Sequence, residues 1–276
     1  MDEKKVIFMG KLTGKTAVVL GAATENNMGQ VIARLFASEG AKVMIAGRNE
    51  NALSALAQEI GGNHALCDIT NHNEVSALAE KSLGDFGGID IAVNTVGWGV
   101  SKSLLDTPNE DLEKMVAVQF TGVHYFLSEM VRAMMAGSSQ GGSIIQISSA
   151  TTKALINNYA AYIGTKSGAD ALIRCVANDY GQFGIRANSV SPALTKTPMT
   201  AGSFGIPGLV DAFLPRYPLG RLNTMTDVAN TALWLASDDA FITGENIQCN
   251  RGVTLRGNPQ ATVVGAAIAA ASKASS

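Results

Sequence analysis

Two side chains that could transfer a proton stand four positions apart in the segment AAYIGTK, residues 160–166. On a helix, positions i and i+4 lie on one face, so the phenol of Tyr162 and the ammonium of Lys166 would stand side by side. A neighbouring positive charge lowers the pKa of a phenol from its ordinary value of about 10. The pair is therefore predicted to give or take a proton near neutral pH, and Lys166 could also bind ribose hydroxyls.

A hydroxyl that could work with this pair comes from the segment just upstream. The run GSIIQIS, residues 142–148, is typical of a buried strand and delivers Ser148 and Ser149 to its carboxyl end. A serine hydroxyl there could hydrogen-bond a substrate oxygen and polarise a carbonyl group. Tyr159 complicates the prediction, because it also precedes Lys166 and could face the same cleft as Tyr162.

The elements that must position these residues alternate between strands and helices, which predicts a parallel sheet with helices on both faces. The predicted strands cover residues 15–21, 42–47, 64–68, 89–94, 142–148 and 185–191, and the predicted helices cover 29–39, 71–86, 109–136 and 159–182, with another through Leu53, Leu56 and Ile60. The expected fold class is α/β. We expect a single Rossmann-type, doubly wound domain over residues 1–276 with a mostly seven-stranded parallel sheet.

The loop after the first strand, GAATENNMG, runs from Gly21 to Gly29. Ligands of such sheets bind at the carboxyl ends of the strands, where glycine lets the backbone approach a pyrophosphate. The N-terminus of the following helix would offer free N–H groups and a positive dipole to the phosphates. Asn27 stands where a middle glycine could be, and Asn tolerates left-handed backbone angles better than most residues. We interpret the loop as a degenerate dinucleotide-binding motif.

The residue after the second strand bears on which dinucleotide is bound. An acidic residue there would hold the adenosine ribose hydroxyls, but the sequence has Gly47-Arg48. Arg48 could instead pair with a 2′-phosphate, which favours NADP(H), with NAD(H) as the alternative. Asp68, expected at the end of the third strand, could accept a hydrogen bond from the adenine amino group or cap the next helix.

Composition argues against several other classes of function. The net charge is −2 and there is no Lys/Arg cluster, so we expect neither nucleic acid nor a membrane as partner. The apolar run at the start is too short for a signal peptide, and no run is long enough to span a bilayer. The three cysteines lack metal-ligand spacing. These features predict a cytoplasmic protein with no metal and with reduced, mostly buried thiols. The charged share of only 16% points to surface hidden in an oligomer.

In their order and spacing, the motifs resemble those of the short-chain dehydrogenase/reductase family over roughly residues 12–257. They are the Gly21–Gly29 loop, VNTVG (93–97), Ser149, Tyr162-x3-Lys166, NSVSPALTKTPM (188–199) and the segment from PLGRL to GENI (218–247). The resemblance implies that Tyr162 is the general acid/base, Lys166 its pKa partner and ribose ligand, and Ser149 the orienting group. Members are usually homotetramers or homodimers, with the long tyrosine-bearing helix at an interface.

The same resemblance supplies the remaining cofactor contacts. It implies that Asn94 lines the cofactor cleft, that Thr197 contacts the cofactor, and that the backbone of Thr195 bonds the carboxamide. The cofactor-binding residues expected in total are Gly21, Asn27, Met28, Gly29, Arg48, Asp68, Ile69, Asn94, Thr95, Val96, Gly97, Tyr162, Lys166, Pro192, Ala193, Thr195, Thr197 and Met199.

Three positions depart from the pattern of the family. Its usual NNAG appears here as residues 94–97, NTVG, and its usual PG as Pro192-Ala193. Many members carry a fourth catalytic residue, an Asn on the central helix that is thought to hold a relay water. Gln119 stands at that position and is included among the catalytic residues. It could act from a longer arm, or it could be a helix residue packed near the sheet.

Two alternatives to carbonyl chemistry stay open at this point. Tyr159-x6-Lys166 and the long glycine loop resemble the enoyl-thioester reductases, a divergent branch of the same superfamily in which the tyrosine stabilises an enolate oxygen. We favour carbonyl chemistry because that branch generally does not keep Ser149 and Tyr162 together. A chain of another class, a nucleotide-binding sensor or scaffold without catalysis, would also keep the fold.

The expected substrate wall is apolar. It consists of Trp98, Leu155, Ile156, Tyr159, Met199, Phe204 and Phe213, and residues 196–218 are expected to form a substrate loop with short helices. No Arg or Lys pair there is directed at a phosphate or carboxylate, so the predicted substrate is an apolar ketone or secondary alcohol. The tail, residues 258–276, is weakly helical, and its Val and Ile part is expected to pack on a neighbouring subunit.

Overall fold

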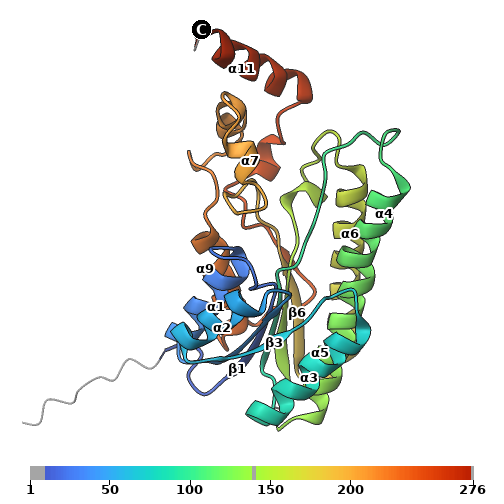
Figure 1. Cartoon of the computed structure of the whole chain (residues 1–276), viewed down its shortest axis with the longest axis vertical. Helices are drawn as coiled ribbons and strands as arrows, with labels where there is room; N and C mark the ends of the chain where they lie inside the picture. The colour runs from blue at the N-terminus through green and yellow to red at the C-terminus, as the bar shows by residue number, and fades with distance from the viewer. Residues whose placement is uncertain (1–9, 139–140, 275–276) are drawn as a thin grey trace, which may run out of the picture.

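One parallel sheet organises the computed structural model, which describes residues 10–138 and 141–274. Its seven strands lie in the order β3-β2-β1-β4-β5-β6-β7, and every neighbouring pair is parallel (Figure 1). They are β1 (Thr16–Leu20), β2 (Lys42–Gly47), β3 (Asn63–Leu66), β4 (Ile91–Asn94), β5 (Gly142–Ile147), β6 (Ile185–Val190) and β7 (Asn246–Ile247). The doubly wound Rossmann-type sheet expected from the sequence is confirmed.

Helices cover both faces of the sheet, because its central strands carry apolar side chains on each side. Along β1, Ala17 and Val19 pack into one buried cluster, whereas Val18 and Leu20 pack into the other. The first cluster includes side chains of α1 (Met28–Ser38), α2 (Glu50–Ile60) and α9 (Met225–Ala236). The second includes those of α3 (His72–Phe86), α5 (Gly122–Ala136) and α6 (Ala160–Tyr180). Figure 1 shows the two groups of helices on opposite sides of the strands.

The central helix differs from the expectation of one helix over residues 109–136. It begins as α4 (Asn109–Val116), passes through a π-helical segment (Ala117–Thr121) and continues as α5. A π-helical turn carries an extra residue, which changes the direction of the side chains around it. Gln119 lies in that turn and is fully buried. The third strand is also shorter than predicted, since it ends at Leu66 and leaves Asp68 in the following loop.

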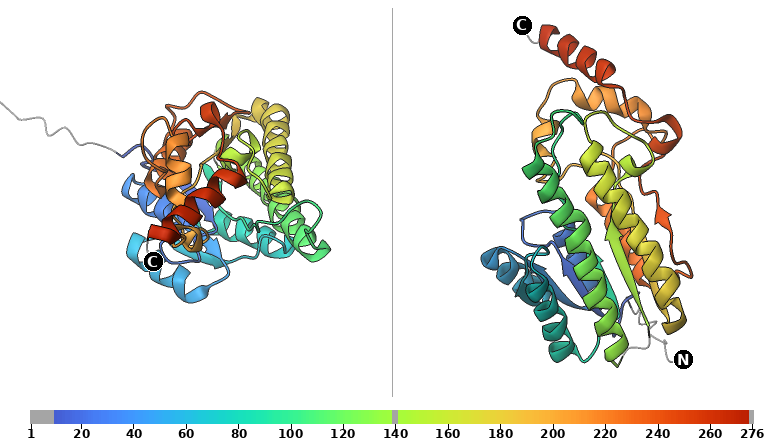
Figure 2. Two further views of the ribbon diagram at one scale, coloured as in Figure 1. Left: turned by 90° about the horizontal axis from the view of Figure 1, so that it is seen from above. Right: turned by 90° about the vertical axis from the view of Figure 1, so that its right-hand side faces the viewer.

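Several short helices and the C-terminal helix lie together at one end of the molecule, beyond the sheet (Figures 1 and 2). They are α7 (Ala201–Phe204), α8 (Leu209–Phe213), a 3₁₀ turn (Leu214–Arg216), α10 (Val253–Arg256) and α11 (Ala261–Ala274). The long loop with short helices predicted for 196–218 is confirmed. The tail is helical, but it packs against α8 of its own chain.

Three further observations concern the cysteines, membrane-spanning helices and possible metal ligands. All three cysteines are unpaired, and Cys175 is exposed, which corrects the expectation of mostly buried thiols because this position of α6 faces outward. Within the described ranges, no helix combines the length and apolar character needed to cross a membrane. The same ranges contain no cluster of His, Cys, Asp or Glu side chains that could hold a metal ion.

Candidate active site

A cavity of about 940 Å³ opens at the carboxyl ends of the strands, where sheets of this type bind ligands. Its wall runs from the Gly21 loop and the start of α1 to Ser149, Tyr162 and Lys166, and on to the substrate loop and α11. Most of the residues predicted for the site line it, including Ser149, both tyrosines and Lys166. Its volume and extent suit a dinucleotide with a substrate beside it.

The glycine loop is packed so tightly that larger residues would not fit. Gly21 has a φ of +102°, and a Cβ there would lie 2.4 Å from Thr95 Oγ1. A Cβ on Gly29 would lie 2.6 Å from the carbonyl oxygen of Gly21. Gly29 therefore packs against the backbone of Gly21 on the side away from the cavity, and it does not line the cavity. The loop and the helix N-terminus next to it fit a pyrophosphate, because backbone and anion can approach closely.

Asn27 has a different role from the one predicted. Its φ is −92°, so the left-handed conformation expected of it is wrong, and its neighbour Asn26 has the positive φ of 53° instead. The Asn27 side chain accepts a hydrogen bond from Gln30 N (2.9 Å) and donates one to the carbonyl oxygen of Gly21 (2.7 Å). It thus caps α1 and ties the loop to the helix, which explains why an asparagine can serve there.

Arg48 and Asp68 stand at the nucleotide end of the cavity. Arg48 Nη1 lies 3.4 Å from Asp68 Oδ2, and 78% of the arginine side chain is exposed. Burial opposes ionisation of Asp68, but hydrogen bonds from Thr70 and the nearby guanidinium outweigh it and lower the pKa of this carboxyl. The N-cap of α3 is Asn71, so the capping alternative considered for Asp68 does not hold.

The side chains predicted to be catalytic, except Gln119, all line the cavity. Ser149 Oγ lies 2.8 Å from Thr151 Oγ1, and its hydroxyl is near enough to the Tyr162 phenol to act against the rise of its pKa. The Tyr162 ring is close against the backbone of Gly99, where a Cβ would lie 2.5 Å from Tyr162 Cδ2. Lys166 Nζ lies 5.9 Å from the centre of the Tyr162 ring and donates a hydrogen bond to the carbonyl oxygen of Ile147 (2.9 Å).

The predicted lowering of the phenol pKa is wrong for the protein by itself. Burial raises the pKa of Tyr162 to about 12, and the Ser149 hydroxyl only partly opposes this. Burial also lowers the pKa of Lys166 to about 8, against the effect of Asp170. For the Tyr162 phenol, the effect of burial outweighs that of the lysine charge. The Lys166 ammonium makes its hydrogen bond to a backbone carbonyl and lies beside the tyrosine ring, not at the phenol oxygen.

Tyr159 lines the cavity next to Tyr162, with the two rings edge to face and their centres 6.0 Å apart. Two phenols therefore border the reaction space, as the spacing in the sequence predicted. Tyr159 precedes α6 and Tyr162 lies in its first turn.

Besides Gly29, four predicted residues lie outside the cavity wall. Asn94 is fully buried, where it donates to Gln146 Oε1 (2.9 Å) and accepts from Val96 N (3.0 Å), so it shapes the turn beneath the cavity. Leu155 is 67% exposed and points elsewhere. Phe204 and Gln119 do not line the cavity either.

Gln119 is nevertheless close to the catalytic lysine. Its Nε2 donates to Thr165 Oγ1 (2.9 Å), and its Oε1 has no hydrogen-bond partner among the described residues. A Cβ on Gly97 would lie 3.2 Å from Lys166 Nζ and 3.4 Å from Gln119 Oε1, so both groups border the same small space beside Gly97.

The sequence argument missed a buried carboxyl beneath this group. Asp170 follows Lys166 by one helical turn, and its side chain accepts hydrogen bonds from Ser148 (2.9 Å), Ser189 (2.7 Å) and Asn246 (2.6 Å). Ser148 directly follows β5, Ser189 lies in β6 and Asn246 in β7, so Asp170 ties α6 to the strand ends. The four-residue spacing from Tyr162 through Lys166 to Asp170 was the signal that could have identified it.

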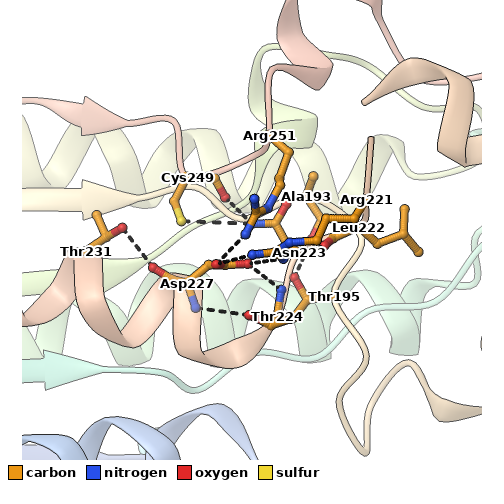
Figure 3. A network of polar contacts seen from close by, with 10 residues as sticks. All are labelled: Ala193, Thr195, Arg221, Leu222, Asn223, Thr224, Asp227, Thr231, Cys249 and Arg251. Atoms are coloured by element: carbon orange, nitrogen blue, oxygen red, sulfur yellow. Dashed lines mark hydrogen bonds and ion pairs between the residues drawn. The ribbon is translucent and has the colours of Figure 1, made fainter. Parts of the chain in front are cut away.

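The base of the substrate loop is fixed by a polar network (Figure 3). Asp227 in the first turn of α9 pairs with both Arg221 and Arg251. Asn223 donates to the carbonyl oxygen of Cys249 (2.7 Å) and forms a β-bridge with Thr195. The network therefore holds Thr195, and the Thr197 backbone beyond it, at the edge of the cavity.

Trp98, Ile156, Met199 and Phe213 line the substrate side of the cavity as predicted. Lys114, which the sequence argument did not include, places its Nζ 4.1 Å from the centre of the Trp98 ring. Val264 and Ile268 of α11 complete this wall. No pattern in residues 258–276 predicted that the tail reaches the cavity.

A doubly wound sheet with a close-packed glycine loop and a Ser–Tyr–Lys group at its strand ends defines a Rossmann-type enzyme that uses a dinucleotide. Comparison with known proteins assigns the family. The model for a family described as enoyl-(acyl carrier protein) reductase matches residues 21–254. The mitochondrial borneol dehydrogenase of Lavandula x intermedia is 34% identical over 89% of this chain and 92% of its own length. The chain belongs to the short-chain dehydrogenase/reductase family and is an oxidoreductase of that type.

Solved structures agree with this assignment. A short-chain type dehydrogenase/reductase from Mycobacterium ulcerans superposes with a TM-score of 0.85 at 30% identity, covering 90% of this chain and 92% of that one. A gluconate 5-dehydrogenase from Burkholderia cenocepacia, solved with NADP and tartrate, gives a TM-score of 0.84 at 27% identity, with 88% and 96% covered. Members of the family use NAD or NADP as cofactor.

Proposed function

We propose that the protein is an NADP(H)-dependent oxidoreductase that interconverts an apolar ketone and a secondary alcohol. The observation that carries the proposal is that two hydroxyl side chains, Ser149 and Tyr162, line one cavity between the nucleotide loop and an apolar wall. The relative from Lavandula x intermedia is named a borneol dehydrogenase, which supports alcohol/ketone chemistry over reduction of an enoyl-thioester.

In this mechanism, Ser149 and Tyr162 each donate a hydrogen bond to the carbonyl oxygen of the substrate. When bound, the reduced nicotinamide supplies the hydride that adds to the carbonyl carbon. Tyr162 gives its proton to the oxygen as negative charge develops there, and Ser149 stabilises that charge through its hydroxyl. In the oxidation of an alcohol, the phenolate of Tyr162 takes the hydroxyl proton. Lys166 is placed to bind the ribose hydroxyls with its remaining N–H donors.

The raised phenol pKa predicts how each direction depends on pH. Oxidation needs the phenolate, whose fraction grows as pH rises toward a pKa of about 12. We therefore expect kcat/KM for an alcohol to rise by up to roughly tenfold per pH unit between about pH 6 and pH 9. Reduction of the ketone needs the protonated phenol and should not rise. Steady-state rates over this range test the prediction, and an alcohol profile that is flat or falls with pH would contradict it.

Arg48 is proposed to select NADP(H) through the 2′-phosphate of the adenosine ribose. Arg48 lines the cavity, and its guanidinium is exposed although it lies near Asp68, so it is free to meet a phosphate. The gluconate 5-dehydrogenase was solved with NADP, which also supports this role. The Arg48→Ala variant should bind NADPH roughly 10- to 100-fold more weakly and leave the affinity for NADH nearly unchanged. The control is Arg34→Ala, which removes a charge paired with Glu59 away from the cavity wall. Equal weakening of both cofactors in Arg48→Ala would reject the assignment.

A second candidate function is reduction of an enoyl-thioester with Tyr159 as the enolate-stabilising group. The position of Tyr159 in the cavity and the description of the matching family model favour it. Supplying NADPH with a ketone and, separately, with an enoyl-thioester distinguishes the two by the absorbance of the reduced cofactor. Tight cofactor binding without turnover of either compound would instead favour the third alternative, a nucleotide-binding sensor or scaffold without catalysis.

Other expectations from the sequence stay predictions. They are the homotetramer or homodimer, the cytoplasmic location, and the organisation of residues 1–276 as one catalytic domain.

A further inference from the structure

The C-terminal helix α11 lies beyond the segment shared with the family, because the family model ends at residue 254. We propose that α11 is the substrate-selecting roof of the cavity and that it favours bulky, uncharged alcohols and ketones over small ones. This inference rests on the carbonyl/alcohol function proposed above and names the substrate class of that same site. It concerns residues Ala261–Ala274, which lie outside the segment that the family model matches.

One face of α11 is part of the cavity wall. Val264, Gly265 and Ile268 line it, and positions 264 and 268 are one helical turn apart. Opposite them are Leu209 and Phe213 of the substrate loop. Val264 also packs against the apolar cluster that contains Phe213. The substrate side of the cavity is therefore closed by apolar groups from the loop and from the helix.

The N-terminus of α11 is tied to the segment that carries the catalytic hydroxyls. Ala261 N donates to Asn157 Oδ1 (3.0 Å), and Asn258 Nδ2 donates to the carbonyl oxygen of Ala154 (2.6 Å). Both acceptors lie between Ser149 and Tyr159 in the sequence. The roof consequently has a defined position relative to the reacting carbonyl group, although it is 104 residues away along the chain.

A second attachment holds the middle of the helix. A Cβ on Gly208 would lie 2.4 Å from the carbonyl oxygen of Ala267, so the backbones of the substrate loop and α11 are in direct contact. Gly208 has a φ of +79°, which any other residue would adopt only with strain. Adding a methyl group at this position should push the helix away from the loop.

The charges around the cavity indicate an uncharged substrate. Among the described residues that line it, the charged side chains are Arg48, Asp68, Lys114 and Lys166. The first two are at the nucleotide end, Lys166 serves the reaction centre, and Lys114 lies over Trp98. None of these comes from α11 or from the substrate loop, so a substrate lying beneath the roof meets no charged side chain there. It meets the apolar groups of α11 and of Leu209 and Phe213, together with the hydroxyls of Thr197, Thr200 and Ser203.

The direct test compares a bulky and a small alcohol, borneol and propan-2-ol, with NADP as cofactor. The wild type should favour borneol in kcat/KM. Ile268→Ala should lower kcat/KM for borneol by roughly tenfold, mainly through KM, and change propan-2-ol by less than about threefold. Val263→Ala is the matched control, because Val263 is on the same helix, 43% exposed and outside the cavity wall. NADP affinity should be the same in all variants.

Gly208→Ala tests the attachment and should reduce the preference for borneol by roughly tenfold or more. Its control is Gly220→Ala, which has a similar φ of +72° but no atom within 4 Å of the new methyl group. Unchanged borneol-to-propan-2-ol ratios in both Ile268→Ala and Gly208→Ala would overturn the inference while leaving the proposed function intact. A wild type that oxidises neither alcohol and reduces neither ketone would remove the proposed function itself.

Discussion

The Tyr162→Phe variant should lose about 10²–10⁴-fold in kcat for ketone reduction and retain nearly unchanged NADPH affinity. The phenylalanine ring keeps the contact with Gly99 but has no proton to give to the carbonyl oxygen. Ser149 would remain as the only one of the two hydroxyls that interact there. Single-turnover rates together with NADPH titration measure the two quantities separately. A fall in both rate and affinity would point to disturbed packing instead.

Tyr159→Phe is the matched control for this prediction, because it removes a second phenol from the same cavity at a ring distance of 6.0 Å. We expect it to keep at least roughly a tenth of the wild-type rate. The opposite result, an active Tyr162→Phe enzyme and an inactive Tyr159→Phe enzyme, would transfer the proton-donor role to Tyr159. Activity on an enoyl-thioester would then be the expected finding.

The Asp170→Ala variant should lose about 2–5 kcal/mol of folding free energy. Three donors, two in strands and Ser148 just after β5, would lose their acceptor in a site where Asp170 is only 8% exposed. Because these bonds join α6 to the strand ends, cofactor affinity should fall as well. Chemical denaturation measures the change as a lower midpoint at an unchanged m-value.

Two further variants sharpen the prediction for Asp170. Asp170→Asn keeps one acceptor oxygen and should be of intermediate stability. Asp179→Ala, on the exposed end of the same helix, should change the stability by less than about 0.5 kcal/mol. An Asp170→Ala variant as stable as Asp179→Ala would show that the buried carboxyl is dispensable for the fold.

The fold was largely predictable because its signals are local. The strands β1, β2, β4, β5 and β6 are short buried apolar runs, and the helices between them have apolar positions at helical spacing, so the alternation and the doubly wound sheet follow from the sequence. The two-residue β7 has no such signal and was not located. The π-helical turn at Gln119 was not predictable in this way. It adds one residue within an otherwise regular helical pattern, and the periodicity on either side conceals it. The same holds for Asn27, whose role depends on partners at Gly21 and Gln30.

The convergence of Ser149, Tyr162 and Lys166 on one cavity was predictable, because a strand end and helical spacing bring them together. It was not predictable where the outcome depends on burial or on distant segments. The phenol pKa is one example, since desolvation outweighs the charge that the spacing implied. Asn94 and Leu155 are others, because one is hidden beneath the cavity and the other points outward. The approach of α11 to the cavity depends on contacts over 104 residues, which no local pattern encodes.

The hydrogen bond from Lys166 to the carbonyl oxygen of Ile147 has a consequence for cofactor affinity. A free lysine side chain loses about 1.5–2 kcal/mol of rotamer freedom when it is immobilised. Here that loss occurs during folding, because the strand end already holds the ammonium in place. A ribose bound by Lys166, as proposed above, would therefore meet a pre-organised donor, and more of the energy of that contact would be retained as binding strength.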